Sequence, residues 1–102
     1  MSTLHTVNKS PFRTATLLQC VQRCQPGDAV LLIEDGVYGA ITGTDLAAAV
    51  EAASDGVAIH VLEGDLRARG IDESKVPADV RRVDYGGFVD LVAEHDRTVS
   101  WL

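Results

Sequence analysis

Short apolar runs alternate along the chain with stretches in which apolar residues recur every three or four positions. The first pattern is typical of strands and the second of helices. Ala29–Ile33 is continuously apolar and lies between two turn signals, as expected of a strand that is buried on both faces. Four further strands are predicted, at Thr3–Val7, Val57–Leu62, Val80–Asp84 and Thr98–Leu102.

Helical segments separate these strands. The first is expected from Pro11 to about Cys24, because Ser10 can cap a helix and proline suits the first helical position. Pro26 and Gly27 then end it and turn the chain. Three further helices are predicted, at Leu46–Ala53, Leu66–Arg69 and Phe88–His95. A polar loop is expected at 71–79, before the last of these helices.

Strands that alternate with helices in this way are typical of parallel sheets. We therefore predict an α/β fold, a single three-layer domain over residues 1–102 with a mostly parallel five-stranded sheet flanked by helices. The C-terminal strand is apolar and contains Trp101, the only tryptophan. We expect it to complete an edge of the sheet or to dock on another chain.

Composition narrows the function. The 102 residues are 46% hydrophobic and carry a formal net charge of −6. Such an acidic chain is a poor candidate for direct nucleic-acid binding, which needs a basic face against the phosphates. There is no apolar run of the ~18 residues that a membrane span requires, and the first residues do not resemble a signal peptide. We expect a cytoplasmic protein without membrane contact, in which thiols stay reduced.

Several kinds of site are disfavoured by the motifs. The chain lacks both the P-loop pattern and the G-x-G-x-x-G pattern, which leaves an unrelated nucleotide-binding α/β module as a weaker alternative. The histidines, His5, His60 and His95, do not occur at metal-ligand spacings, and neither H-x-x-x-H nor C-x-x-C is present. We expect these histidines at the margin of the core or on the surface, with no metal and no cofactor.

Cys20 and Cys24 remain as candidates for chemistry. They are spaced i, i+4 on the first predicted helix, where their Cβ atoms would lie ~5–6 Å apart, farther than a disulfide allows. Cys24 falls in the apolar stripe and is expected in the core, whereas Cys20 lies on its flank and is expected to be accessible. Arg23 favours a Cys20 thiolate and the helix dipole opposes it, so Cys20 is a weakly activated nucleophile or simply a small hydrophobic residue.

Four segments, in order along the chain, resemble the DsrH/TusB family. The first is the opening Leu4–Phe12, with L-H-T followed by S-P and an aromatic residue, and the second is the apolar strand with its acidic-glycine ending, Gly27–Val37. The third is the L-x-A-R-G segment Leu66–Gly70, and the fourth is the D-Y-x-x-F-V segment within Val83–Val89. The resemblance spans essentially the whole chain, and family members also tend to end near a tryptophan.

The resemblance implies a subunit that acts with partner chains rather than a stand-alone enzyme. Family members form a heterohexamer with DsrE/TusD-like and DsrF/TusC-like subunits. The assembly passes persulfide sulfur between carriers of the DsrC/TusE-like and TusA-like kinds. It serves either sulfur oxidation or 2-thiouridine formation in tRNA, and it needs no metal or organic cofactor.

A cysteine on the first helix is a feature of DsrH-type subunits that TusB-type subunits generally lack, and Cys20 matches it. The resemblance therefore favours a DsrH-like chain and makes Cys20 the candidate persulfide carrier, acting by thiol–persulfide exchange. Cys24 lies outside the pattern and is interpreted as structural. The alternative is a non-catalytic subunit that only scaffolds the heterohexamer. The isolated chain is expected to self-associate as a homo-oligomer, because an interface for relatives would otherwise stay exposed.

Overall fold

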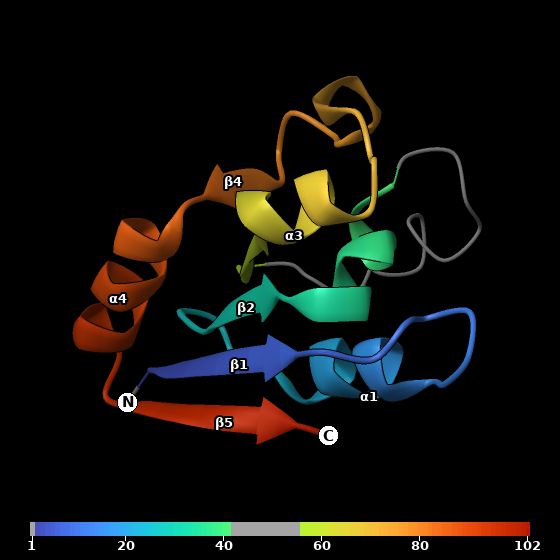
Figure 1. The fold of residues 1–102 in the computed structure, drawn as a ribbon. Helices are drawn as coiled ribbons and strands as arrows, with labels where there is room; N and C mark the ends of the chain where they lie inside the picture. The colour runs from blue at the N-terminus through green and yellow to red at the C-terminus, as the bar shows by residue number, and fades with distance from the viewer. Residues whose placement is uncertain (1, 42–55) are drawn as a thin grey trace.

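In the computed structural model, which describes residues 2–41 and 56–102, the described strands form one parallel sheet in the order β4-β3-β2-β1-β5 (Figure 1). The strands are β1 (Thr3–Val7), β2 (Ala29–Leu32), β3 (Ala58–Leu62), β4 (Arg81–Val83) and β5 (Arg97–Trp101). All four pairs of neighbouring strands are parallel: β1 with β2, β1 with β5, β2 with β3, and β3 with β4. The predicted mostly parallel five-stranded sheet is confirmed, with each strand within two residues of its expected bounds.

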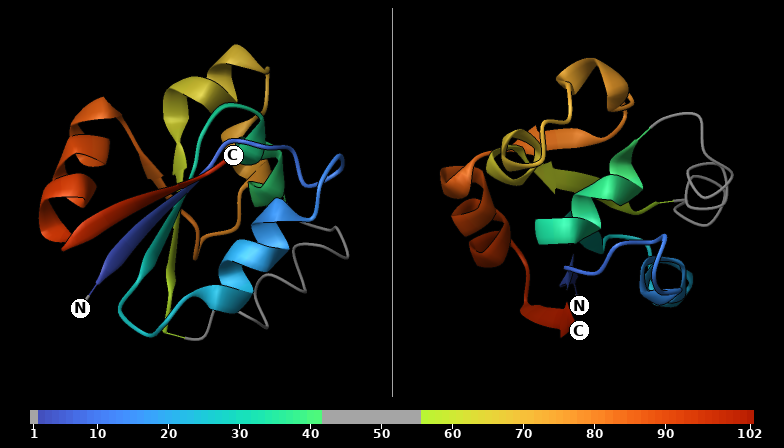
Figure 2. Two further views of the ribbon diagram at one scale, coloured as in Figure 1. Left: turned by 90° about the horizontal axis from the view of Figure 1, so that it is seen from below. Right: turned by 45° about the vertical axis from the view of Figure 1, so that its right-hand side comes forward.

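Helices cover both faces of this sheet. Among the described residues, the α-helices are α1 (Thr16–Arg23), α3 (Glu63–Ala68) and α4 (Tyr85–Glu94), and the 3-10 helices are η1 (Glu34–Ala40) and η2 (Glu73–Lys75). Figure 2 shows α1 on one face and α4 on the other, so the predicted three-layer arrangement is confirmed. The helix expected at Leu46–Ala53 lies outside the described residues. Within the described ranges, none of the helices has the length and apolar character needed to traverse a lipid bilayer.

The first helix is shorter than predicted at both ends. The amide groups of Arg13 and Thr14 donate to the carbonyl oxygen of Ser10 at 3.1 and 3.2 Å, so Ser10 does start a turn, but only an isolated one. The helix begins afresh at Thr16. At its other end Cys24 has an extended backbone conformation (φ −66°, ψ 147°), and the residue that follows precedes a proline, which disfavours further helix. Cys24 therefore lies just beyond the helix.

Two later helices begin three residues earlier than expected. Asp84 caps α4, because its Oδ1 accepts a hydrogen bond from the Gly87 amide at 2.8 Å. The helix α3 follows β3 directly, starting at Glu63. The predicted loop at 71–79 contains the short helix η2, whose cap Asp72 accepts from the Ser74 amide at 2.9 Å.

The core is divided by the sheet into two layers. The larger layer lies on the α1 side and combines residues of β1, β2 and β3 with α1, η1 and α3; its fully buried members include Val7, Leu17, Cys20, Val21, Val30 and Val61. The smaller layer lies on the α4 side around Leu4, Leu31 and Leu91. All residues of β1 and β2 are buried, which explains why Ala29–Leu32 is an uninterrupted apolar run.

The C-terminal strand completes one edge of the sheet. β5 pairs with β1 along its whole length, from Thr3 opposite Arg97 to Val7 opposite Trp101. The partly buried Trp101 ring packs against the α1-side core. Of the two expectations for this segment, the first is confirmed.

Candidate functional site

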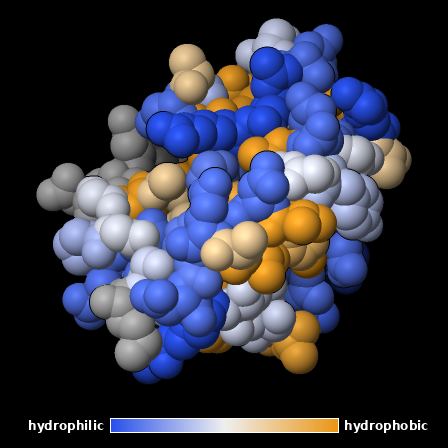
Figure 3. Space-filling model, turned by 90° about the vertical axis from the view of Figure 1, so that its left-hand side faces the viewer, coloured by the Kyte–Doolittle hydropathy of each residue, from blue (hydrophilic) through white to orange (hydrophobic). Residues whose placement is uncertain are grey.

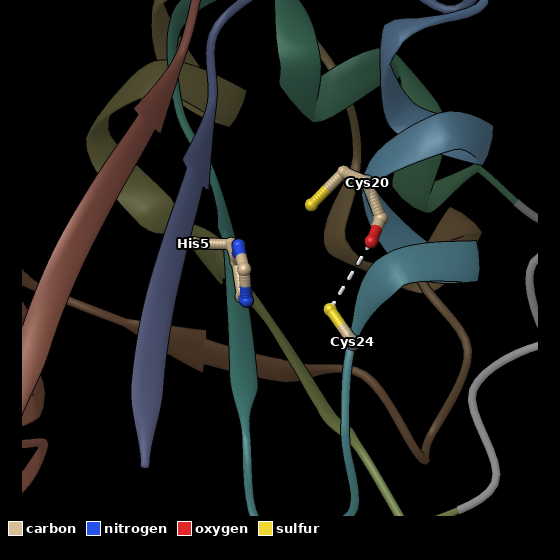
Figure 4. A group of neighbouring side chains, drawn as sticks. All are labelled: His5, Cys20 and Cys24. Carbon is tan, nitrogen blue, oxygen red and sulfur yellow. Dashed lines mark hydrogen bonds between the residues drawn. The ribbon is translucent and has the colours of Figure 1, made fainter. Parts of the chain in front are cut away.

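A cluster of His5, Cys20 and Cys24 lies between strand β1 and helix α1 (Figure 4). One side-chain ligand atom from each residue lies within 4.8 Å of the other two. The strand alternation of β1 directs His5 to the α1 side together with Val7, while Leu4 faces the α4 side. The sequence brings the two cysteines together by helical spacing, but it is the β1–α1 packing that adds the histidine.

The exposures of the two cysteines are the reverse of those predicted. Cys20 is 0% exposed and belongs to the core, whereas Cys24 is only partly buried. The prediction was wrong because it assumed a helix from Pro11, with an apolar stripe through Thr14 and Cys24. In the shorter helix the buried residues are Leu17, Cys20 and Val21, at spacings i, i+3 and i+4. Thr14 is exposed and Cys24 lies past the last turn.

Both cysteines are free thiols, as expected from their spacing. The Cys24 thiol donates to the carbonyl oxygen of Cys20, with Sγ and O 3.3 Å apart. When Cys24 ionises, the neighbouring Cys20 thiol can donate to it instead. That hydrogen bond, with burial as the second cause, raises the pKa of Cys20 far above the usual thiol range. The same hydrogen bond lowers the pKa of Cys24 below its ordinary value, although burial opposes the shift.

His5 is held in one tautomer by two neighbours. The indole N–H of Trp101 can only donate, so His5 Nδ1, 3.0 Å away, must be the unprotonated acceptor. The proton of the neutral ring is then on Nε2, which donates to Asp28 Oδ2 at 3.1 Å. Sequence reasoning did not find this network. The parallel register of β1 with β2 was the available signal, because it places Asp28 beside Thr3 at the start of both strands.

Asp28 is a buried carboxylate that joins three segments. Besides His5, it accepts from the amides of Thr3 and Gln25, each at 3.0 Å. Burial works against its ionisation, but the hydrogen bonds from Gln25, His5 and Thr3 outweigh burial and lower the pKa of Asp28 below its ordinary value. The site therefore contains a fixed negative charge next to a neutral imidazole and two thiols.

The cluster has the soft donor atoms that a transition metal prefers, two cysteine sulfurs and one histidine nitrogen. Both nitrogens of His5 are already engaged, one by Trp101 and the other by Asp28. A metal ion would have to displace one of these partners. The geometry is better suited to thiol chemistry, with one cysteine partly buried and the other fully buried beside it.

The remaining histidines do not join this cluster. His60 lies in β3 and is 6% exposed, and its Nδ1 has no hydrogen-bond partner among the described residues. Burial, with the nearby positive charge of Arg81, lowers its pKa below the ordinary value. His95 follows α4 and donates through Nδ1 to the carbonyl oxygen of Leu91 at 2.7 Å. The expected placement at the core margin or on the surface is confirmed for the partly buried His95 and was wrong for His60, which is buried in the sheet, as is His5.

Known proteins similar to this chain match it over nearly its whole length. The family model described as DsrH like protein matches residues 9–98. Protein TusB of Pectobacterium parmentieri is 37% identical over 100 residues, covering 96% of this chain and 99% of that protein. Protein TusB of Photorhabdus laumondii subsp. laumondii is 34% identical, again over 96% of this chain and 99% of its own length.

Solved structures with the same fold are more distant in sequence. The ychN protein from E. coli superposes with a TM-score of 0.74 at 14% identity, covering 98% of this chain and 99% of that one. A protein of unknown function, MTH1491 from Methanobacterium thermoautotrophicum, gives 0.72 at 19% identity, covering 97% of this chain and 96% of its own. These likenesses concern the fold, whereas the sequence matches identify the relatives. This chain belongs to the DsrH-like protein family.

Proposed function

We propose that this chain is a subunit of a sulfur-relay assembly that passes persulfide sulfur between carrier proteins. The observation that carries the proposal is the match to the DsrH-like family and to proteins named TusB along nearly the entire chain. The free thiols beside the His5–Asp28 pair add chemistry of the appropriate kind. The assembly works in the cytoplasm, where thiols stay reduced.

Two branches of the relay are distinguished by their products. The relatives reported above are TusB proteins, which supports the branch that forms 2-thiouridine in tRNA. Cys20, in contrast, is the feature that resembles DsrH-type subunits of sulfur oxidation. We favour the tRNA branch on the similarity of the whole chain. Deletion of the gene in the source organism should then remove 2-thiouridine from digested tRNA, measured by mass spectrometry of the nucleosides. Unchanged 2-thiouridine with impaired sulfur oxidation would overturn this choice.

The chain is proposed to act with DsrE/TusD-like and DsrF/TusC-like subunits and with TusA-like and DsrC/TusE-like carriers. Exposed apolar side chains on α4 support a role in assembly, since Tyr85 and Val89 are 74% and 65% exposed. Figure 3 shows the α4 side of the molecule, where hydrophobic surface is interspersed with hydrophilic groups. Co-expression with the two partner subunits should yield one complex in which all three chains co-elute on gel filtration.

The match to the first-helix cysteine of DsrH-type subunits makes Cys20 a candidate persulfide carrier. The complete burial of its thiol favours the alternative, a scaffold subunit without chemistry of its own. Intact-mass spectrometry of the complex after incubation with a persulfide donor separates the two. A gain of one sulfur atom in this chain shows that the chain itself carries sulfur in the relay. No gain, with transfer through the complex intact, leaves it as a scaffold.

A further inference from the structure

We infer that Cys24, rather than Cys20, is the thiol at which sulfur enters this subunit, and that Cys20 is the neighbouring hydrogen-bond donor that supports it. The inference rests on the proposed sulfur-relay function, within which it assigns the reacting atom. It places the acceptor sulfur at the end of α1, on a residue that the family pattern does not include.

Access to the surface differs between the two sulfurs. Cys24 is the C-cap of α1, where the chain leaves the helix in an extended conformation, and its neighbours Arg23 and Gln25 are exposed. Cys20 lies one turn earlier on the buried face, with 0% exposure among the core side chains of α1 and β1. A persulfide on another protein has to bring its outer sulfur into contact with the attacking thiolate. Cys24 is the less buried of the two residues, so a donor has less of the protein to displace in order to reach it.

The surroundings of Cys24 also favour its ionised form. The sulfurs of Cys20 and Cys24 lie within 4.8 Å of each other, and the Cys20 thiol has no exposed path to water. The Cys20 S–H is therefore the neighbouring donor that can stabilise a thiolate on Cys24. The lowered pKa of Cys24 and the raised pKa of Cys20 agree with this division of roles.

The sulfur transfer is balanced without any further reagent. The Cys24 thiolate attacks the outer sulfur of a donor persulfide, R–S–SH, and a bond forms between that sulfur and Cys24 Sγ. The S–S bond of the donor breaks, and R–S⁻ leaves with its electron pair. The thiolate R–S⁻ takes up the proton that Cys24 gave to solvent. The products are a Cys24 persulfide and the donor thiol, with no net oxidation.

Alkylation of the reduced full-length chain with iodoacetamide tests the assignment, with each cysteine followed by peptide mass spectrometry across a pH series. We expect Cys24 to react on the order of tenfold faster than Cys20. Cys20→Ala should move the midpoint of the Cys24 profile to higher pH, because alanine donates no hydrogen bond. Cys20→Ser should restore most of the shift, since its hydroxyl can donate. Faster labelling of Cys20, or a Cys24 midpoint that is the same in all three chains, overturns the inference.

Loading with a persulfide donor separates this inference from the function on which it rests. We expect the wild-type chain and Cys20→Ser to gain one sulfur atom, and Cys24→Ser to gain none. Sulfur gain that is lost only in Cys20→Ser overturns the assignment while the relay function stands. If no chain gains sulfur while Cys24 still labels first, the relay chemistry of this subunit fails, and with it the role of Cys24 as the sulfur acceptor.

Discussion

His5 and Asp28 are joined by a buried hydrogen bond of 3.1 Å between Nε2 and Oδ2, across the boundary of strands β1 and β2. The same carboxylate holds the amide of Gln25, the residue that follows Cys24. Asp28 thus fixes the end of α1 relative to β1, and with it the position of Cys24 relative to His5. Beside the hydrogen bond between the two thiols, which has the largest effect, the Asp28 charge is a smaller cause that raises the pKa of both Cys20 and Cys24.

Substitution of Asp28 by alanine is predicted to destabilise the fold by roughly 3 kcal/mol, because the donors on Thr3, Gln25 and His5 lose their acceptor. Urea unfolding followed by circular dichroism measures the change. Asp79→Ala provides a matched control at an exposed position and should have little effect. Equal stabilities of the two variants would show that the Asp28 network contributes nothing to the fold.

His60 makes stability depend on pH. Its pKa is lowered in the fold relative to its ordinary value of 6.5, so the folded state takes up the proton at lower pH than the unfolded chain does. As pH falls below 6.5 toward the folded-state pKa, the unfolded state binds more protons and the free energy of unfolding decreases. Above this window the group has no such effect.

His60→Leu should therefore lose less stability than wild type between pH 7.5 and pH 5, in a series of thermal or urea unfolding curves at about those values. It should also be more stable at pH 7 by about 1 kcal/mol, because it removes a buried nitrogen without a partner among the described residues. His95→Gln leaves His60 in place and should keep most of the pH dependence. If the free energy of unfolding changed with pH to the same extent in His60→Leu as in wild type, His60 would not be the source of the pH dependence.

Most of the fold was predictable because it depends on local patterns. Short runs rich in strand-forming residues identified the strands, most clearly the continuous apolar run Ala29–Ile33, and their alternation with helices indicated a parallel sheet. The start of α1 was not predictable from Ser10 and Pro11, since these residues do begin a turn, and the break at Ala15 has no strong sequence signal. That error reversed the exposures of Cys20 and Cys24. The His5–Trp101 contact joins residues 96 positions apart and depends on the strand order.

Gly36 is predicted to be intolerant of any side chain. A Cβ at this position would clash with the backbone carbonyl oxygen of Val7, which is itself held by the amide of Ile33 at 3.0 Å. Gly36→Ala should destabilise the protein by about 2–3 kcal/mol, measured by thermal unfolding. Gly64→Ala is the matched control. It lies in α3 with no heavy atom within 4 Å of the added methyl group, and it should raise stability by up to about 1 kcal/mol. The same sign of change in both variants would contradict this prediction.

The isolated chain is predicted to self-associate through α4. Tyr85, Val89 and Val92 are 74%, 65% and 43% exposed and follow one another at i, i+4 and i+7, so they form a single apolar stripe along the helix. Without partner subunits this stripe remains in contact with water, and pairing of two copies is the available way to bury it. Gel filtration with light scattering over a range of concentrations measures the association.

Val89→Lys should shift this equilibrium toward monomer by at least about tenfold in the dissociation constant, because a charge in the centre of the stripe would have to be desolvated. Asp90→Asn is a control on the same helix, since its exposed side chain points about 100° away from Val89. A wild-type chain that stays monomeric at all concentrations rules out self-association. Association that persists in Val89→Lys places the contact elsewhere, and the unpaired edge of β5 is then the next surface to test.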